Sequence, residues 1–502
     1  MCRILLLFSC AHLLAAGVIQ GVALEWASGK PLSRTIVHLK PVPGSGSGVR
    51  PMQTRAGRSG QFQFVSVPDG VYLLETQREG FLPAAYGQRR PTGYGTPFAV
   101  AKESSLFAEL RLHRMGAITG TVLDENGVGI PRVEVIAYRA KLPLRVASRG
   151  VTDDRGVYRI TGLELGKHWV RSAAHVLDDG TGLLPMFGPE AREPRDATAH
   201  EVHFDNDTAD ANIRPEPGVL SSLSGRIVCD RMSAVTVTLS SETTRKTTEG
   251  SCGGGYSFNG LAPAVYEIFT AYADGSGSGF TEISVNQNTQ IGLQVITTSP
   301  AQFEVRSAAT RAPLRTPVAL AARRDDLSGA ESFREVPQAR ATLGAGHWEF
   351  IAAGAPSQYV VSIQTDRGEP RRPWRAVRPP DAFPVYLEPW RGGERIRINL
   401  SEQAAQIRGV VTSGGRAAPG MPVYLWPEKE ETRRMAGGAR QALTDIDGRY
   451  QFNGLPPGTY RILATMDIRE ITAEAAEEAQ ASTLTLTEGQ TLQQDLSVWI
   501  AP

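Results

Sequence analysis

The chain has 502 residues, of which 41% are apolar and 21% are charged, and its formal net charge at pH 7 is only +1. This length is too great for one hydrophobic core and suits roughly three to five domains of ordinary size. The apolar fraction is that of a globular protein and argues against a disordered chain. A net charge so close to zero lacks the basic excess that concentrates nucleic acid, so we expect no nucleic-acid partner.

The first 17 residues have the pattern of a secretory signal peptide. Arg3 precedes an apolar run from Ile4 to Ala16, and Ala15-Ala16-Gly17 supplies the small residues that signal peptidase accepts. A permanent anchor helix is a less favoured alternative, because the run is short and interrupted by polar residues. A lipoprotein box at Cys10 is also less favoured, because Phe8 fits it poorly and too few apolar residues precede Cys10. We expect an exported protein that is periplasmic, on the outer surface or extracellular, without a stable membrane span.

One short pattern recurs five times along the chain. It begins with an aromatic residue that is followed two positions later by an apolar residue. After a turn comes a tyrosine, replaced by His168 in the second copy, that is again followed two positions later by an apolar residue. The copies are Phe62-x-Phe64 with Tyr72-x-Leu74, Tyr158-x-Ile160 with His168-x-Val170, Tyr256-x-Phe258 with Tyr266-x-Ile268, Trp348-x-Phe350 with Tyr359-x-Val361, and Tyr450-x-Phe452 with Tyr460-x-Ile462. We call the two leading residues of each copy the first and second landmark. Successive copies start 92 to 102 residues apart, which indicates five repeated units.

Within each unit, apolar residues alternate with polar ones, as in strands with one buried face. Gly (52) and Pro (33) are dispersed as single turn residues, which indicates many short strands. Such strands cannot bury their apolar faces in one flat sheet, but two packed sheets can. We predict an all-β fold, a tandem array of about five small antiparallel β-sandwich domains. The predicted divisions are a signal peptide at 1–17 and sandwiches at 18–114, 115–217, 218–299, 300–403 and 404–502. The five first landmarks should be buried.

The end of the fifth unit predicts two local features. Leu484 to Val498 should form a closing hairpin that turns at Glu488-Gly489, since alternating apolar residues flank a glycine turn. Ile468 to Ala481 is rich in Ala and Glu, so we expect the chain's one helix there, as a solvated connector over the sandwich edge.

Several motifs carry a family resemblance. Ile118-Thr119-Gly120-Thr121-Val122, Asp124-x-x-Gly127, the run from Thr152 to Leu163 and the matching run from Thr444 to Tyr460 resemble the bacterial carboxypeptidase regulatory-like domain. The resemblance implies a small, transthyretin-like (prealbumin/Ig-like) sandwich. The fourth unit departs from it, because it lacks the opening glycine and the Asp-x-x-Gly turn. Residues 80–91 also resemble an insert of long tandem members of this family.

Candidate chemical motifs each have a structural explanation. His200-Glu201-Val202-His203 lacks the i, i+4 spacing of a zinc-protease helix, and residues 200 and 203 would face opposite ways on a strand. Asp205, Asp207 and Asp210 resemble a calcium loop, but they stand where the unit needs a closing turn, for which Asp and Asn are ordinary choices. We therefore expect no enzyme, no metal site and no cofactor.

Two functions remain for such an array. The favoured one is a non-catalytic structural or adhesive protein whose loops contact a protein or a cell-surface polysaccharide. The alternative is a carbohydrate-binding protein that stacks sugars on exposed loop aromatics. The candidate ligand-binding residues are Tyr86, Tyr94, Trp374 and Trp390.

The third unit holds the two cysteines of the mature chain, Cys229 and Cys252. Both should lie at the same end of the sandwich, because Cys229 ends the first strand and Cys252 lies in the turn after the third. Exported proteins meet oxidising conditions, so we predict a disulfide between them. Two unpaired thiols that happen to share a domain are the alternative.

Overall fold

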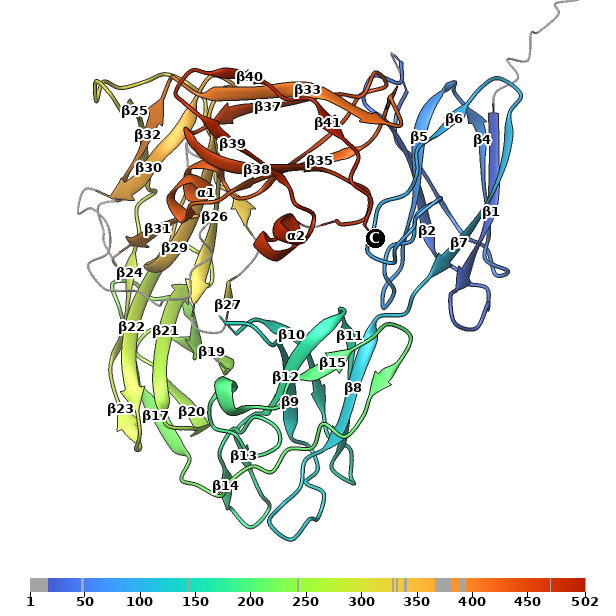
Figure 1. Ribbon diagram of the computed structural model, residues 1–502. Coiled ribbons are helices and arrows are strands. Elements are labelled where there is room, and N and C mark those ends of the chain that lie inside the picture. The colour runs from blue at the N-terminus through green and yellow to red at the C-terminus, as the bar shows by residue number, and fades with distance from the viewer. Residues whose placement is uncertain are drawn as a thin grey trace, which may run out of the picture.

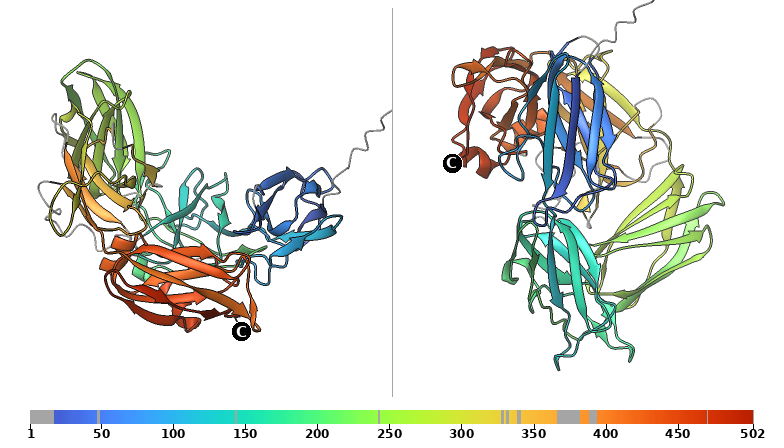
Figure 2. Two further views of the ribbon diagram at one scale, coloured as in Figure 1. Left: turned by 90° about the horizontal axis from the view of Figure 1, so that it is seen from above. Right: turned by 90° about the vertical axis from the view of Figure 1, so that its right-hand side faces the viewer.

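The computed structural model describes residues 17–46, 49–142, 144–241, 243–326, 329–330, 333–337, 341–365, 382–387, 394–469 and 471–501. The fold is an all-β tandem array of about five small β-sandwich domains, each built around its own apolar core. The five units follow one another around a ring, and the fifth unit returns to the first (Figure 1). Two further views show the same order (Figure 2). The predicted signal peptide lies outside the described residues, except for Gly17.

The first unit packs the sheet β4-β1-β7 against the sheet β3-β2-β5-β6. Its strands are β1 (Gly17–Glu25), β2 (Ile36–Pro41), β3 (Met52–Arg55), β4 (Gln61–Val67), β5 (Gly70–Gln77), β6 (Phe98–Val100) and β7 (Ser105–Leu112). The second unit packs β11-β8-β16 against β10-β9-β12-β15 and adds the pair β13-β14. Its elements are β8 (Gly116–Thr121), β9 (Glu134–Arg139), β10 (Val146–Val151), β11 (Val157–Leu163), β12 (Gly166–Ser172), β13 (His175–Val176), β14 (Gly182–Leu183), the 3₁₀ turn Pro194–Asp196, β15 (His200–Val202) and β16 (Asp207–Thr208).

In the third unit the two sheets join at one edge into the path β19-β18-β21-β22-β24-β17-β20, and β23 pairs with β17. Its strands are β17 (Ser221–Cys229), β18 (Ala234–Ser240), β19 (Arg245–Ser251), β20 (Gly255–Leu261), β21 (Ala264–Tyr272), β22 (Gly277–Val285), β23 (Thr289–Gln290) and β24 (Leu293–Thr297). The fourth unit packs β25-β32-β30 against β27-β26-β29-β31, with β28 beside β26. Its strands are β25 (Gln302–Ser307), β26 (Ala319–Asp326), β27 (Gly329–Ala330), β28 (Arg334–Glu335), β29 (Gly346–Ala353), β30 (Tyr359–Thr365), β31 (Phe383–Leu387) and β32 (Arg395–Ser401).

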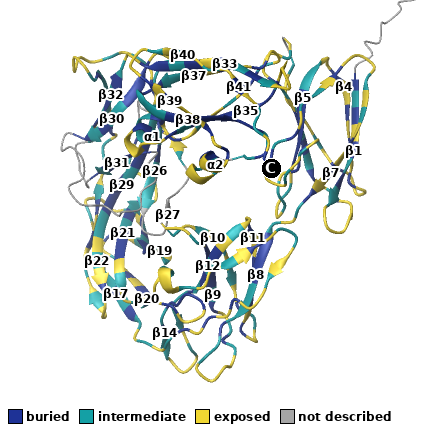
Figure 3. Ribbon diagram, in the orientation of Figure 1, coloured by how far each residue is buried: buried dark blue, intermediate teal, exposed yellow. Residues whose placement is uncertain are grey.

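The fifth unit packs β34-β33-β37 against β36-β35-β38-β39, and β40 and β41 both pair with β33. Its elements are β33 (Ala405–Ser413), β34 (Arg416–Ala417), β35 (Pro422–Pro427), α1 (Glu430–Ala436), β36 (Arg440–Leu443), β37 (Arg449–Leu455), β38 (Gly458–Ala464), α2 (Ala473–Glu478), β39 (Ser482–Leu486), β40 (Thr491–Gln493) and β41 (Leu496–Ser497). Figure 3 shows the buried residues gathered between the sheets and the exposed ones on the loops and outer faces.

Each unit contains a parallel pair inside its otherwise antiparallel sheets. The opening strand of each unit pairs in parallel with a closing strand, as in β1 with β7, β8 with β16 and β33 with β40. In the fifth unit β39 pairs with β38, whereas β40 pairs with β33 in the other sheet. The predicted closing hairpin is thus wrong, because the chain crosses between the sheets at Glu488-Gly489.

The fourth unit has its own topology. In the other four units the first-landmark strand pairs with the opening strand, as β37 does with β33. In the fourth, the first-landmark strand β29 pairs with β26 and β31, and the second-landmark strand β30 joins the opening sheet through β32. Phe62, Tyr158, Tyr256 and Tyr450 are buried as predicted. Trp348 is only half-buried, so the prediction is wrong there.

Two short helices lie in the fifth unit. The predicted helix is shorter than expected, since α2 spans only Ala473–Glu478, and α1 was not predicted. Ala476 of α2 is fully buried and packs in a cluster with Tyr424 and Leu463. The helix therefore covers apolar surface and is not a solvated connector.

Candidate functional site

The described tyrosines among the predicted ligand-binding residues do not form a pair of open rings. Tyr86 is half-buried and packs edge-on against Phe98 in the core of the first unit, with ring centroids 5.3 Å apart. Tyr94 is also half-buried, and its contacts are with the fifth unit. Trp374 and Trp390 lie outside the described residues. The carbohydrate-binding alternative therefore gains no support from these two tyrosines.

Tyr94 belongs to a compact loop between β5 and β6. The loop is organised by Gln88, whose Oε1 accepts the Ala85 N–H at 2.8 Å and whose Nε2 donates to the carbonyls of Arg90 and Pro91 at 2.6 and 2.7 Å. Because a single side chain satisfies three backbone groups, the loop keeps a defined shape and presents Tyr94 at its tip.

The Tyr94 ring docks onto the fifth unit, where it packs against the cluster that contains Tyr424 and Ala476. The Gln441 Nε2 donates to the Tyr94 hydroxyl at 2.9 Å, and the Tyr94 N–H donates to the Met466 carbonyl at 2.6 Å. The Arg469 guanidinium lies 4.9 Å from the ring centroid, within the range of a cation–π contact. An aromatic ring with its polar tip satisfied is the usual anchor of a protein interface.

Close backbone approach also marks this interface. Arg469 Nε donates to the Gly93 carbonyl at 2.9 Å. A Cβ at Gly93 would lie 2.7 Å from the Met466 oxygen, and a Cβ at Gly420 would lie 2.9 Å from Pro97 Cγ. Since real Cβ contacts are longer than 3.0 Å, the two units approach as closely as they do only because glycine stands at these positions.

Buried polar groups flank the Tyr94 contact. Asp467 is 3% exposed, accepts the Ala501 N–H at 2.8 Å and lies 3.9 Å from an Arg89 guanidinium nitrogen of the first unit. Burial raises the pKa of Tyr424, and the neighbouring Tyr94 adds to this rise. The Tyr424 hydroxyl therefore stays protonated and donates to the Ile468 carbonyl. No local pattern predicts this docking site, because Tyr94 and its partner Gln441 lie 347 positions apart in the sequence.

Specific contacts also join the other neighbouring units. The His113 Nδ1 lies 2.6 Å from the Asp205 carboxylate, between the first and second units. The Ala345 N–H donates to Ser278 Oγ at 2.7 Å between the third and fourth units. The Tyr359 hydroxyl donates to Glu488 at 2.9 Å between the fourth and fifth. Asp205, a residue of the suspected calcium loop, is thus engaged in a junction.

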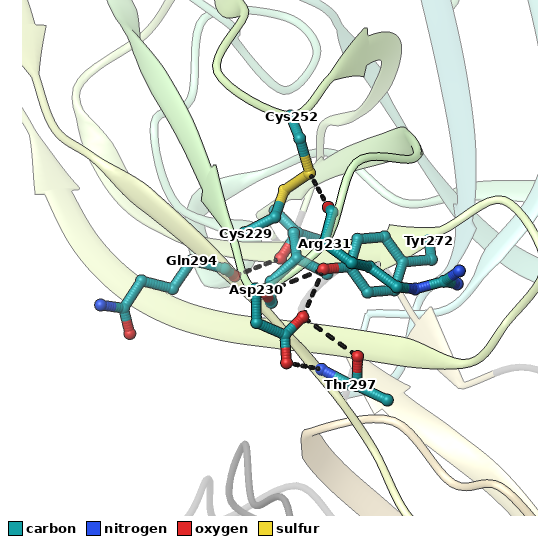
Figure 4. Close-up of a disulfide and its surroundings, with 9 residues drawn as sticks. Cys229, Asp230, Arg231, Cys252, Tyr272, Gln294 and Thr297 are labelled. Carbon is teal, nitrogen blue, oxygen red and sulfur yellow. Dashed lines mark hydrogen bonds between the residues drawn. A yellow bond between two sulfur atoms is a disulfide. The ribbon is translucent and has the colours of Figure 1, made fainter.

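The cysteines of the third unit are joined as a disulfide in the structure, with their Cα atoms 5.6 Å apart (Figure 4). Cys229 is the last residue of β17, and Cys252 follows β19 and is buried. The adjacent Asp230 carboxylate accepts the Tyr272 hydroxyl at 2.7 Å and the Thr297 N–H at 3.0 Å. The carboxylate therefore ties together the strand ends around the cysteine pair.

Within the described part of the chain, no group of three or more His, Cys, Asp or Glu residues is placed to hold a metal ion. None of the helices that the structure describes is long and apolar enough to cross a membrane. Burial lowers the pKa of His200, which was considered above as a metal ligand. Asp207, also considered there, pairs with Arg159 at 2.8 Å.

No protein-family model and no curated protein matches the chain. Solved structures with partial similarity include a minor pilin of Streptococcus agalactiae, at 13% identity and a TM-score of 0.25, which covers 40% of this chain and 97% of that one. The major pilin BcpA of Bacillus cereus is 8% identical with a TM-score of 0.18, covering 56% of this chain and 100% of that one. The major pilin SpaD of Corynebacterium diphtheriae is 10% identical with a TM-score of 0.18, covering 56% and 98%. At these scores the likeness transfers no role to this chain.

Proposed function

We propose that the chain is a non-catalytic, exported structural and adhesive protein, in which the five sandwiches act as one closed scaffold. The observation that carries the proposal is the docking of Tyr94 into the fifth unit. A flexible string of domains would leave this ring in water, whereas here it is half-buried, hydrogen-bonded and flanked by Arg469. Closure of the ring would hold the loops of all units in fixed relative positions, as a multivalent surface requires.

The polar side chains of the repeated motifs support a structural role. The Asp153 carboxylate accepts the N–H groups of Arg155 and Val157, and Asp445 does the same for Asp447 and Arg449. The buried Thr444 hydroxyl donates to the Ala418 carbonyl at 2.6 Å and accepts the Met421 N–H at 2.8 Å. These groups shape turns, which is a structural role.

Small-angle X-ray scattering of the full chain tests the closed scaffold. We expect a scattering profile that fits the ring, and a larger radius of gyration for Tyr94→Asp, which places a charge in the apolar contact. Phe107→Ala is the matched control, because this aromatic side chain of the same unit is 67% exposed and lies away from the interface. A wild-type profile of an extended string, or an unchanged radius in Tyr94→Asp, would contradict the proposal.

Export is tested by sequencing the amino terminus of the protein recovered outside the cytoplasm. We expect the first residue near Gly17, where Ala15-Ala16 precede the predicted cleavage site. Recovery of the chain in the cytoplasm with Met1 retained would count against export.

A further inference from the structure

A pocket of about 350 Å³ lies in the first unit between the insert loop and the end of β7. This volume is within the range of small-ligand sites. The residues that carry its chemistry are Trp26, Gln88, Arg89, Arg90, Glu109 and Arg111. The aromatic candidates predicted from the sequence include none of these residues. The pocket wall combines three segments that are separate in the sequence, so no local pattern marks it.

The aromatic wall is Trp26, the residue that follows β1. Its indole is 53% exposed, although it is the largest apolar group in the pocket. The ring stacks on His113 with centroids 4.5 Å apart and an interplanar angle of 27°, and the backbone N–H of Trp26 donates to the Leu112 carbonyl at 2.8 Å. His113 is itself held by Asp205. The indole is therefore fixed in position while much of its surface stays open, as in a preorganised stacking platform.

The polar wall is formed largely by arginine side chains. Arg89, Arg90 and Arg111 line the pocket together with one carboxylate, Glu109. Arg111 and Glu109 lie two residues apart on β7, hence on the same face, and pair at 2.6 Å while 41% and 46% of their side chains remain exposed. Arg89 is 54% exposed and reaches Asp467 only at 3.9 Å. The partly exposed guanidinium groups of Arg111 and Arg89 can bind a further carboxylate, for which the planar donor fork is well suited.

We propose that this pocket binds an acidic saccharide, with the C–H face of the sugar on Trp26 and the carboxylate at the arginines. A neutral sugar would use the indole but not the charge, and a small anion would use the charge but not the indole. The inference gives the adhesive part of the proposed function a ligand class, and to that extent rests on it.

Isothermal titration calorimetry of the full chain with trigalacturonate tests the proposal. We expect saturable binding that weakens as salt is added, because exposed ion pairs are screened. The fully methyl-esterified trisaccharide should bind at least about tenfold more weakly, a loss of one charge-assisted contact. Citrate, the anion without a sugar face, should also bind more weakly. Equal binding of the acid and its ester, or no binding of the acid at millimolar concentration, would overturn the proposal.

Variants separate the pocket from the fold. Trp26→Ala and Arg111→Gln should each weaken trigalacturonate binding by about tenfold. Glu109→Gln should strengthen it, because the carboxylate that competes for Arg111 is removed; a purely structural role would not produce this gain. Val65→Ala, an exposed position of the same unit on β4 and outside the pocket lining, is the control. An equal loss in Val65→Ala would overturn the assignment. A scattering profile that fits the ring, together with no trigalacturonate binding, would contradict the proposed ligand but not the closed scaffold.

Discussion

Gly409 and Tyr450 lie directly opposite each other on the neighbouring strands β33 and β37. The Tyr450 hydroxyl donates to the Gln494 carbonyl at 2.6 Å, and a Cβ at Gly409 would lie 1.8 Å from the same oxygen. The glycine therefore makes room for the carbonyl that the tyrosine holds. The same triplet recurs as Gly120, Tyr158 and the Ala211 carbonyl, and as Gly225, Tyr256 and the Ile291 carbonyl.

Gly409→Ala should destabilise the fifth unit by about 1 to 3 kcal/mol, because the added methyl group must displace the backbone at Gln494. A change of this size should speed local hydrogen exchange in β33 and β37 by about five- to 150-fold, if exchange proceeds by opening of this unit. Hydrogen-exchange mass spectrometry of the full chain measures it, with peptides of the second unit as internal reference. Unchanged protection of β33 would show that the backbone at Gln494 accommodates the added methyl group without loss of stability.

Tyr450→Phe and Tyr450→Ala should differ in a defined way. The phenylalanine variant keeps the ring but leaves the Gln494 carbonyl without its hydroxyl donor, which should cost about 1 to 3 kcal/mol. The alanine variant also empties a buried site and should cost about 3 to 5 kcal/mol. Pulse proteolysis in urea, read on fragments of the fifth unit, gives both values. Equal stability of the alanine variant and the wild type would contradict the role of the ring.

Alternation predicted the repeated strands and four of the five buried first landmarks, because burial of one strand face is a local property of the sequence. Partners distant in sequence were not predictable in this way. The parallel pairing of β33 with β40 depends on the Gly409 clearance, which alternation does not record. In the fourth unit β29 and β30 lie in the opposite sheets from their counterparts in the other units. The landmark spacing reflects this difference only by one additional residue between the two landmarks.

The candidate sites show the same limit. Tyr94 was singled out as a loop aromatic, but a sequence cannot tell an open ring from one covered by Gln441 and Arg469 of another unit. Trp26 stands alone after a strand, and no local pattern in the sequence marks it as a binding residue. Its neighbours Arg89 and Arg111 come from separate segments that only the fold brings together.

The disulfide between Cys229 and Cys252 can be tested directly. Non-reduced protein recovered outside the cytoplasm should contain the cross-linked peptide pair in mass spectrometry. Reduction should destabilise the third unit by about 3 kcal/mol in the chain-entropy model, since the bridge closes a loop with a sequence separation of 23. Two thiols that alkylate before reduction would support the alternative of unpaired cysteines.

The unit boundaries near residues 115, 218, 300 and 404 remain a prediction that limited proteolysis can test. Cleavage of the full chain at these boundaries should accumulate fragments of roughly 100 residues. At boundaries that lie beside the contact between the first and fifth units, cleavage should be faster in Tyr94→Asp than in the wild type. One resistant core spanning several units under all conditions would contradict separate domains.

The third unit should lose stability in strong alkali. Burial raises the pKa of both Tyr256 and Tyr266 from 10.0 to about 12. Because the folded state favours the neutral phenol, the stability that each tyrosine contributes is complete below pH 10 and is lost as the pH rises through 12. The two hydroxyls donate to the carbonyls of Ile291 and Ala262, and the tyrosinate form cannot donate.

Hydrogen exchange of third-unit peptides between pH 9 and 12, corrected for the intrinsic rate, measures this loss, and ultraviolet absorbance follows tyrosinate formation in the same samples. Tyr266→Phe should lower the stability of the unit at neutral pH and make it less sensitive to alkali, because one of the titrating hydroxyls is gone. Its matched control is Tyr86→Phe in the first unit, which should leave the alkaline response of the third unit unchanged. Full protection of β20 and β21 at pH 12, with both tyrosines ionised, would show that neither hydroxyl contributes to the stability of the third unit.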